Sequence, residues 1–113
     1  VAVHDRMELT ESRWMTPASA LAEHRAGRIV LMPPTLKTIE ELLAFSCTEH
    51  LLAAARSQWI YTIYAEAFRT ADSFGIRLPH DPEYTLNAWK QQPRPGETTR
   101  IVMQDGIWKT LSI

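Results

Sequence analysis

Carboxylates and histidines are the residues of this sequence that could do chemistry, and few of them lie close together. His80, Asp81 and Glu83 share a short segment with Pro82. An imidazole and two carboxylates are donors that a divalent metal accepts, whereas an Asp-Pro pair is typical of an ordinary turn. This segment therefore has two interpretations, a metal site or a turn.

Two acidic pairs are close in sequence on segments that could be ordered. Glu8 and Glu11 precede a predicted strand, and Glu40 and Glu41 are neighbours on a predicted helix. Adjacent helical residues point about 100° apart, so Glu40 and Glu41 are poorly placed to share one metal ion. Glu8 and Glu11 could meet at a hard cation such as Mg²⁺, or could form a solvated turn.

Four basic side chains could contact a diphosphate: Arg77, Lys90, Arg94 and Arg100. Arginine suits bidentate recognition of phosphate, although isolated cations in a balanced composition also fit a solvated face. The sequence has no glycine-rich phosphate loop and no zinc-type pair of cysteines. Its one cysteine, Cys47, excludes an internal disulfide and favours a reducing, cytoplasmic location.

The bulk composition excludes two classes of partner. A formal net charge of −1 gives no electrostatic reason to bind nucleic acid or an anionic membrane. No apolar run approaches the roughly 18–20 residues that a membrane helix needs. The 113 residues suffice for a single domain or part of one, and the opening Val-Ala-Val-His resembles the end of a strand already under way. We therefore expect either a missing N-terminal segment or association with a second copy.

The segment that must position these side chains is residues 11–45. Trp14 predicts a short strand pinned to a core, or the border of a nucleotide pocket. Thr16-Pro17 is typical of a helix start, and Gly27 is placed to end that helix. His24 is expected to face water.

A double proline divides this segment from a second helix. Pro33-Pro34 is expected to exclude helix, with Thr35 or Thr38 capping the helix that follows. A third helix is predicted from Thr48 to about Gln58, either as a helical hairpin with the second or as one kinked helix.

The C-terminal half is predicted to be rich in strands. Residues 59–64 and 74–78 are strand candidates, although residues 65–69 could instead extend a helix, and residues 79–97 are expected to be mostly loop. Residues 100–111 predict a hairpin, because Asp105-Gly106 favours the positive φ angles of a tight turn. The expected core is Trp14, Leu21, Leu31, Ile39 and Leu42.

Three segments together resemble a known family. RWMTPASAL (residues 13–21), GRIVLMPPT (27–35) and TIEELL (38–43) are similar to the part of Nudix hydrolases that follows the catalytic helix, especially in the branch of coenzyme A diphosphatases. The likeness covers residues 8–44, and is weaker at residues 73–84 and 94–108. The family's signature helix, with its Arg-Glu-x-x-Glu-Glu-x-Gly run, is not in this sequence.

The resemblance implies a fold and a function. The fold would be α+β, a partial α/β/α sandwich with two or three helices and a C-terminal β-hairpin. Residues 1–113 would form a single domain, with a strand-helix-helix core in 1–58 and a β-rich extension in 59–113. The reaction would be metal-assisted hydrolysis, with Mg²⁺ or Mn²⁺, of a nucleoside diphosphate linked to another group such as coenzyme A or a related nucleotide.

We assign roles to six residues on this basis. Substrate contacts are assigned to Trp14, Pro34, Thr35 and Arg100, and metal contacts to Glu8 and Glu11. The main metal ligands and catalytic residues would lie outside this sequence. The alternative is a non-catalytic Nudix-like module for binding or dimerisation.

Overall fold

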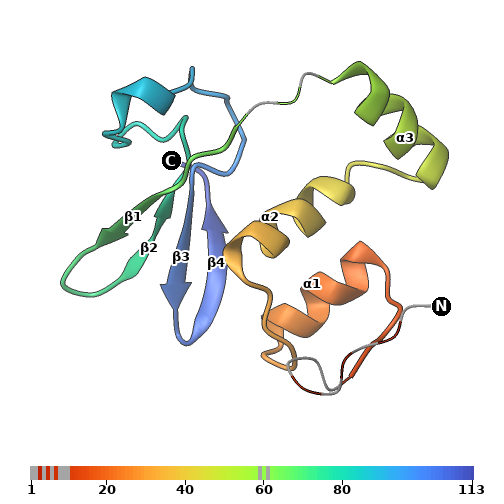
Figure 1. Ribbon diagram of the computed structural model, residues 1–113. Helices are drawn as coiled ribbons and strands as arrows, with labels where there is room; N and C mark the ends of the chain where they lie inside the picture. The colour runs from red at the N-terminus through yellow and green to blue at the C-terminus, as the bar shows by residue number, and fades with distance from the viewer. Residues whose placement is uncertain (1–2, 4, 6, 8–10, 59, 61) are drawn as a thin grey trace.

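Helices occupy the first half of the chain and strands the second (Figure 1). The computed structural model describes residues 3, 5, 7, 11–58, 60 and 62–113. Within them the helices are α1 (Pro17–Arg25), α2 (Pro33–Leu42) and α3 (Thr48–Ser57), and the strands are β1 (Glu66–Arg69), β2 (Phe74–Arg77), β3 (Arg100–Gln104) and β4 (Ile107–Leu111). A short 3₁₀ helix, η1 (Asn87–Trp89), lies between β2 and β3. The predicted α+β class and its C-terminal hairpin are confirmed.

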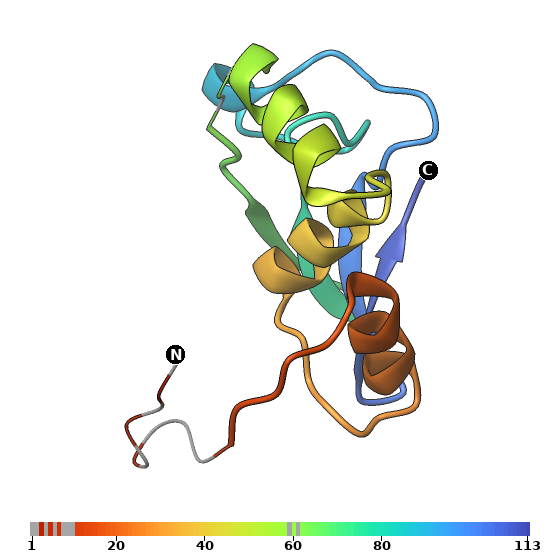
Figure 2. The same cartoon turned by 90° about the vertical axis from the view of Figure 1, so that its right-hand side faces the viewer.

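The strands form an antiparallel sheet in the order β1-β2-β3-β4. Ile76 pairs with Ile101, and Ile101 with Thr110, so these side chains share one face. The helices lie on the same side of the sheet, in front of it in Figure 2. The connection between β2 and β3 contributes other buried side chains, among them Leu78 and Tyr84.

A small hydrophobic cluster joins the helices to the sheet. Its buried members are Leu21 of α1, Leu36 of α2 and Ile101 of β3. Leu31, Ile39, Ile76 and Trp108 pack against them and are partly buried. The predicted core is thus correct for Leu21, Leu31 and Ile39. It is wrong for Trp14 and does not include Leu42, which is half-buried elsewhere.

The prediction that Trp14 anchors a strand in the core is wrong. Residues 11–16 have no strand, and the Trp14 side chain is 93% exposed. No strand of the sheet pairs with this segment, which leads directly into the capped start of α1. Burying an indole needs a surrounding apolar surface, which a residue-type preference cannot supply.

Local signals at α1 are confirmed. The Thr16 hydroxyl accepts a hydrogen bond from the Ser19 N–H at 3.1 Å, and Pro17 takes the first helical position. Gly27 follows the end of α1 with φ of 71°, and its N–H donates to the His24 carbonyl at 2.9 Å. Glycine adopts this left-handed conformation without steric cost.

The expectation that Pro33-Pro34 excludes helix is wrong. Pro33 is the first residue of α2 and Pro34 the second. At these positions a backbone N–H would have no acceptor within the helix, so proline loses no hydrogen bond. Neither predicted threonine cap is formed. Met32 is the N-cap residue and makes no side-chain cap bond, while the Thr38 hydroxyl donates to the Pro34 carbonyl at 2.9 Å.

His24 is buried rather than exposed to water. Its side chain is 3% exposed, with Nε2 2.8 Å from the Trp108 carbonyl oxygen. The Leu31 N–H donates to Nδ1 at 3.1 Å, which leaves Nε2 to donate to the Trp108 carbonyl. His24 therefore ties α1 both to β4 and to the segment that leads into α2.

The later elements differ from expectation mainly in their limits. In the 59–64 candidate strand, residues 59 and 61 lie outside the described residues, and Ile60 and residues 62–64 have no strand. The strand is β1, at Glu66–Arg69, so the helical alternative for residues 65–69 is also wrong. β2 confirms the 74–78 candidate, and α3 begins at Thr48 as a helix separate from α2. The connection over 79–97 is mostly loop, as predicted.

The hairpin has the predicted turn. Asp105 has φ of 53° and Gly106 φ of 77°, as a tight two-residue turn between right-twisted strands requires. At Gly75 the reason for glycine is different, because a Cβ there would overlap the Ile101 carbonyl oxygen of the neighbouring strand.

The helices of the described residues are too short and too polar to cross a membrane.

The difference in burial between Trp14 and Leu21 yields a direct prediction. Leu21→Ala should lower the free energy of unfolding by about 2–5 kcal/mol, since it removes a buried side chain and leaves a cavity. Trp14→Ala should change it by less than about 0.5 kcal/mol, as expected of an exposed position. Denaturant unfolding followed by circular dichroism measures both. A larger loss for Trp14→Ala than for Leu21→Ala would contradict the core assignment.

Candidate functional site

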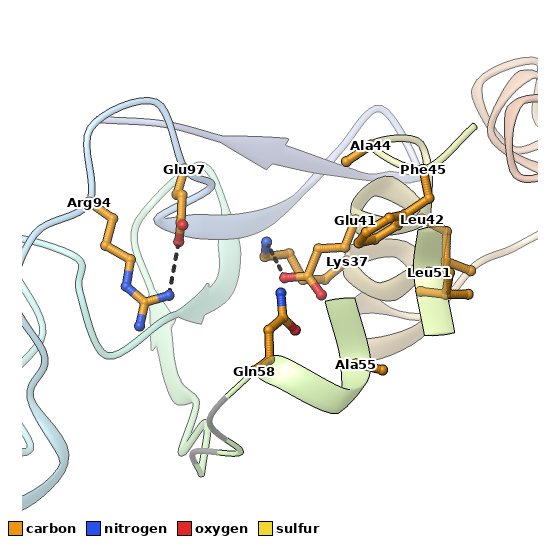
Figure 3. A pocket seen from close by; sticks show the side chains of 10 residues that line it. All are labelled: Lys37, Glu41, Leu42, Ala44, Phe45, Leu51, Ala55, Gln58, Arg94 and Glu97. Carbon is orange, nitrogen blue, oxygen red and sulfur yellow. Dashed lines mark hydrogen bonds and ion pairs between the residues drawn. The ribbon is translucent and has the colours of Figure 1, made fainter. Parts of the chain in front are cut away.

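The candidate site is an open groove of about 500 Å³ between α2, α3 and the loop before β3 (Figure 3). Its volume is within the range of small-molecule pockets. The residues that line it are Lys37, Glu41, Leu42, Ala44, Phe45, Leu51, Ala55, Gln58, Arg94 and Glu97.

One wall of the groove is apolar. Leu42 and Phe45 come from the end of α2 and the turn that follows it, and Leu51 and Ala55 come from α3. Leu51 and Ala55 are four residues apart, so they lie on the same face of the helix. This wall can bind the apolar part of a ligand.

The four charged side chains of the lining form two ion pairs. Lys37 Nζ lies 2.7 Å from Glu41 Oε1, one helical turn away on α2. Across the groove, Arg94 Nη1 lies 3.5 Å from Glu97 Oε2. Figure 3 shows the two pairs on opposite sides, with the Gln58 amide between them. Because each cation has its own carboxylate, the groove offers hydrogen-bonding groups without a strong net charge.

The loop that carries Arg94 and Glu97 is held by His80. The His80 ring is buried, and its Nε2 donates to the Thr98 carbonyl at 2.8 Å. Glu97 Oε2 is 4.0 Å from the same nitrogen. The Gln91 N–H donates to the Pro79 carbonyl at 2.8 Å and fixes the other end of the loop.

Arg100, an assigned substrate contact, forms a buried ion pair instead. Its Nε and Nη2 each lie 2.7 Å from a carboxylate oxygen of Asp81, which is 0% exposed. Burial works to raise the pKa of the Asp81 carboxyl, but hydrogen bonds from Arg100, the Glu83 N–H and Thr99 outweigh it, so this pKa lies below its ordinary value. The bond to Asp81 in turn raises the pKa of Arg100.

The other candidate phosphate contacts are engaged as well. Arg77 Nη2 pairs with Glu83 at 3.0 Å, and the Arg77 guanidinium lies 4.6 Å from the centre of the Phe68 ring. Lys90 Nζ donates to the Tyr84 carbonyl at 3.1 Å. With Arg94 on Glu97, all the predicted diphosphate contacts are thus bound to other groups of the chain.

The segment with His80, Asp81 and Glu83 forms a turn. The Asp81 N–H donates to the Leu78 carbonyl at 2.9 Å, and Asp81 Oδ1 accepts from the Glu83 N–H at 2.8 Å. Among the described residues no three His, Cys, Asp or Glu side chains come together as a metal site would need.

The assigned metal contacts lie far from this groove in the sequence. Glu8 is outside the described residues, and Glu11 is exposed and pairs with Arg13 at 2.6 Å. Glu11 lines a shallow polar hollow with Glu23, whose carboxylate pairs with Arg28 at 2.7 Å. The hydrogen bond from Arg28 lowers the pKa of Glu23 below its ordinary value.

The remaining assigned contacts are exposed but separate from the groove lining. Trp14 points to solvent, and Pro34 and Thr35 lie in the first turn of α2. Helix N-termini bind anions through free N–H groups. Pro33 and Pro34 have none, so Thr35 is the first residue of α2 with an N–H to offer.

Sequence reasoning missed the groove. The signals that could have found it are the Lys37–Glu41 spacing and the apolar Leu51–Ala55 spacing, but neither tells which elements face one another. Comparison of the chain with models of protein families, with curated proteins and with solved structures found no match.

The Asp81–Arg100 pair yields a stability prediction. Asp81→Asn should cost about 3–5 kcal/mol at neutral pH, because it removes the buried carboxylate that binds both Nε and Nη2 of Arg100 and leaves only the exposed Glu83 carboxylate, 3.5 Å from Nη2, as a counter-charge. The exposed Asp105→Asn, which touches only the surface pair with Lys109, should cost about 0–1 kcal/mol. Denaturant unfolding measures both variants.

The same pair yields a pH dependence. Since folding lowers the pKa of Asp81, its contribution is complete above the ordinary aspartate value of about 3.9 and is lost as the pH falls through the folded value. The difference in unfolding free energy between the native chain and Asp81→Asn should therefore shrink below about pH 4. A difference that is constant from pH 7 to pH 2 would contradict the ion pair.

Proposed function

We propose that this chain is part of a Nudix-type hydrolase that cleaves a nucleoside diphosphate linked to another group. The observation that carries the proposal is the way in which the resembling segments pack together. Leu21, from the first segment, and Leu36, directly after the second, are buried in one cluster with Ile101. Segments that resemble one family at a given spacing and also form one packed unit are better evidence than either segment alone.

The conspicuous residues of these segments have structural roles in this chain. Thr16 and Pro17 begin α1, while Pro33 and Pro34 begin α2. In the proposed enzyme these helices support the site rather than perform the chemistry. The groove then supplies contacts to the part of the substrate that lies away from the diphosphate.

The metal ions of the proposed reaction would be held elsewhere. Mg²⁺ and Mn²⁺ bind several converging oxygen ligands, and in this chain Glu11 and Glu23 are each neutralised by an arginine. The described residues therefore do not fit the metal site. We place the Mg²⁺ or Mn²⁺ ligands on the family's signature helix, which would belong to a longer protein that contains this chain.

A non-catalytic Nudix-like module for binding or dimerisation is the second candidate. The neutralised cations of the groove favour it, since diphosphate contacts normally need free positive charge. The two candidates differ in whether the residues encoded before Val1 include the signature helix.

The test is hydrolysis by the chain and by the longer protein. Coenzyme A, ADP-ribose and a dinucleotide are supplied in turn, first with Mg²⁺ and then with Mn²⁺. We expect turnover by the longer protein and none by the 113-residue chain, because the developing negative charge needs divalent cations and the described residues bring together no cluster of metal ligands. Turnover by the short chain at the rate of the longer protein, abolished by Glu8→Gln, would place the catalytic site within this sequence.

A matched pair of variants tests the part played by the groove. In the longer protein, Leu51→Ser should raise KM several-fold, since Leu51 lines the groove, and should leave kcat within about twofold. Leu52→Ser is the control, because Leu52 lies on the same helix, is half exposed and is not part of the lining. Equal KM values for the two variants would remove the groove from the substrate site.

A further inference from the structure

Helix α3 is held to the rest of the chain more weakly than α1 or α2. All ten of its residues are described, and none is buried. By contrast, α1 and α2 pack on one another, and α2 packs on β4. No other element packs closely on α3 within the described part of the chain, and it stands apart from the sheet in Figure 1.

A short helix with no buried residue gains little stability from packing. Isolated helices shorter than about 12–15 residues are marginal in water, and most helical stability comes from packing an apolar face. Helix α3 has such a face, on which Leu51 and Ala55 line the groove with Leu42 and Phe45, while Figure 3 shows Arg94 and Glu97 on the far side of the groove. Further burial of this face would stabilise α3.

The connection between α2 and α3 permits a change in their relative position. Helix α2 ends at Leu42, and the chain turns through Ala44 and Phe45 with 3.2 Å backbone hydrogen bonds to the last turn of α2. Cys47 then takes an extended conformation, with φ of −157° and ψ of 166°, before α3 begins. A few residues of this sort can absorb a rigid rotation of the helix.

We propose that α3 is a lid that closes over the groove by rotating about residues 43–47. Closure moves Ala55 and Gln58 towards the loop that carries Arg94 and Glu97, and it covers the apolar wall formed by Leu42, Phe45 and Leu51. The groove is the same one that the proposed function assigns to substrate. The proposal that α3 is a lid depends only on the weak packing of α3, and its test needs no substrate.

Disulfide trapping tests the direction of closure. In a Cys47→Ser background, which removes the native exposed thiol, Ala55→Cys is combined with Glu97→Cys. The control combines Ala53→Cys with Glu97→Cys, since Ala53 lies on the same helix and is exposed like Ala55 but is outside the groove lining. Each pair is oxidised in a glutathione buffer, and the rate of disulfide formation is followed by mass spectrometry.

Amide hydrogen exchange of the unmodified chain supplies the second readout. We expect the Ala55 pair to oxidise at least tenfold faster than the Ala53 pair, and the amides of α3 to exchange at least tenfold faster than those of α1 and α2. Equal oxidation rates for the two cysteine pairs would show that residues 48–57 approach Glu97 without a preferred face, as an unfolded segment does. Protection of α3 equal to that of α1 would show a fixed helix, and either result overturns the proposal. Neither the oxidation rates nor the amide exchange depends on hydrolysis. If the longer protein proved inactive, the proposed function would fail and the test of the lid would stand.

Discussion

The contact between the helices and the sheet is the constraint on which the rest of the structure depends. Leu21 and Leu36 meet Ile101 in a small cluster, and His24 adds a hydrogen bond to the carbonyl of Trp108. The Thr110 hydroxyl donates to Glu40 at 2.7 Å and fixes α2 against β4 in the same way. The position of α2 sets that of Lys37 and Glu41, and hence one side of the groove. A small cluster of this kind leaves little redundancy, so each buried side chain in it matters.

The features that could be predicted from the sequence are those decided by neighbouring residues. Thr16-Pro17 starts α1, Gly27 follows its end, and Asp105-Gly106 turns the hairpin, because each acts within one turn of backbone. The failures are of the opposite kind. Pro33-Pro34 can either break or begin a helix, and the burial of His24 depends on β4, which lies 84 residues away.

The candidate site could be predicted even less well, for the same reason. Arg100 has the chemistry of a phosphate contact, but in the fold it meets Asp81, which lies 19 residues before it. Residue type alone cannot separate a cation that is free for a ligand from one that holds a loop in place. The groove itself depends on three segments whose spacing in the sequence gives no sign that they meet.

The structure and the resemblance contribute different parts of the functional argument. The proposed reaction depends on the resemblance, whereas the structure shows what the resembling segments do in this chain, which is to begin helices and fill a core. The buried ion pair of Asp81 and Arg100 ties the turn after β2 to the start of β3. The groove has one wall on α2, which packs on α1 and β4, and another on α3, none of whose residues is buried.

A double-mutant cycle between Leu36 and Ile101 tests the central claim, that the helices are held on the sheet by this cluster. The unfolding free energies of Leu36→Ala, Ile101→Val and the double variant are compared with that of the native chain. The account predicts a coupling energy of about 0.5–3 kcal/mol, as for side chains that share a core. Strictly additive losses, within about 0.3 kcal/mol, would mean that α2 does not pack on β3 and would contradict the account.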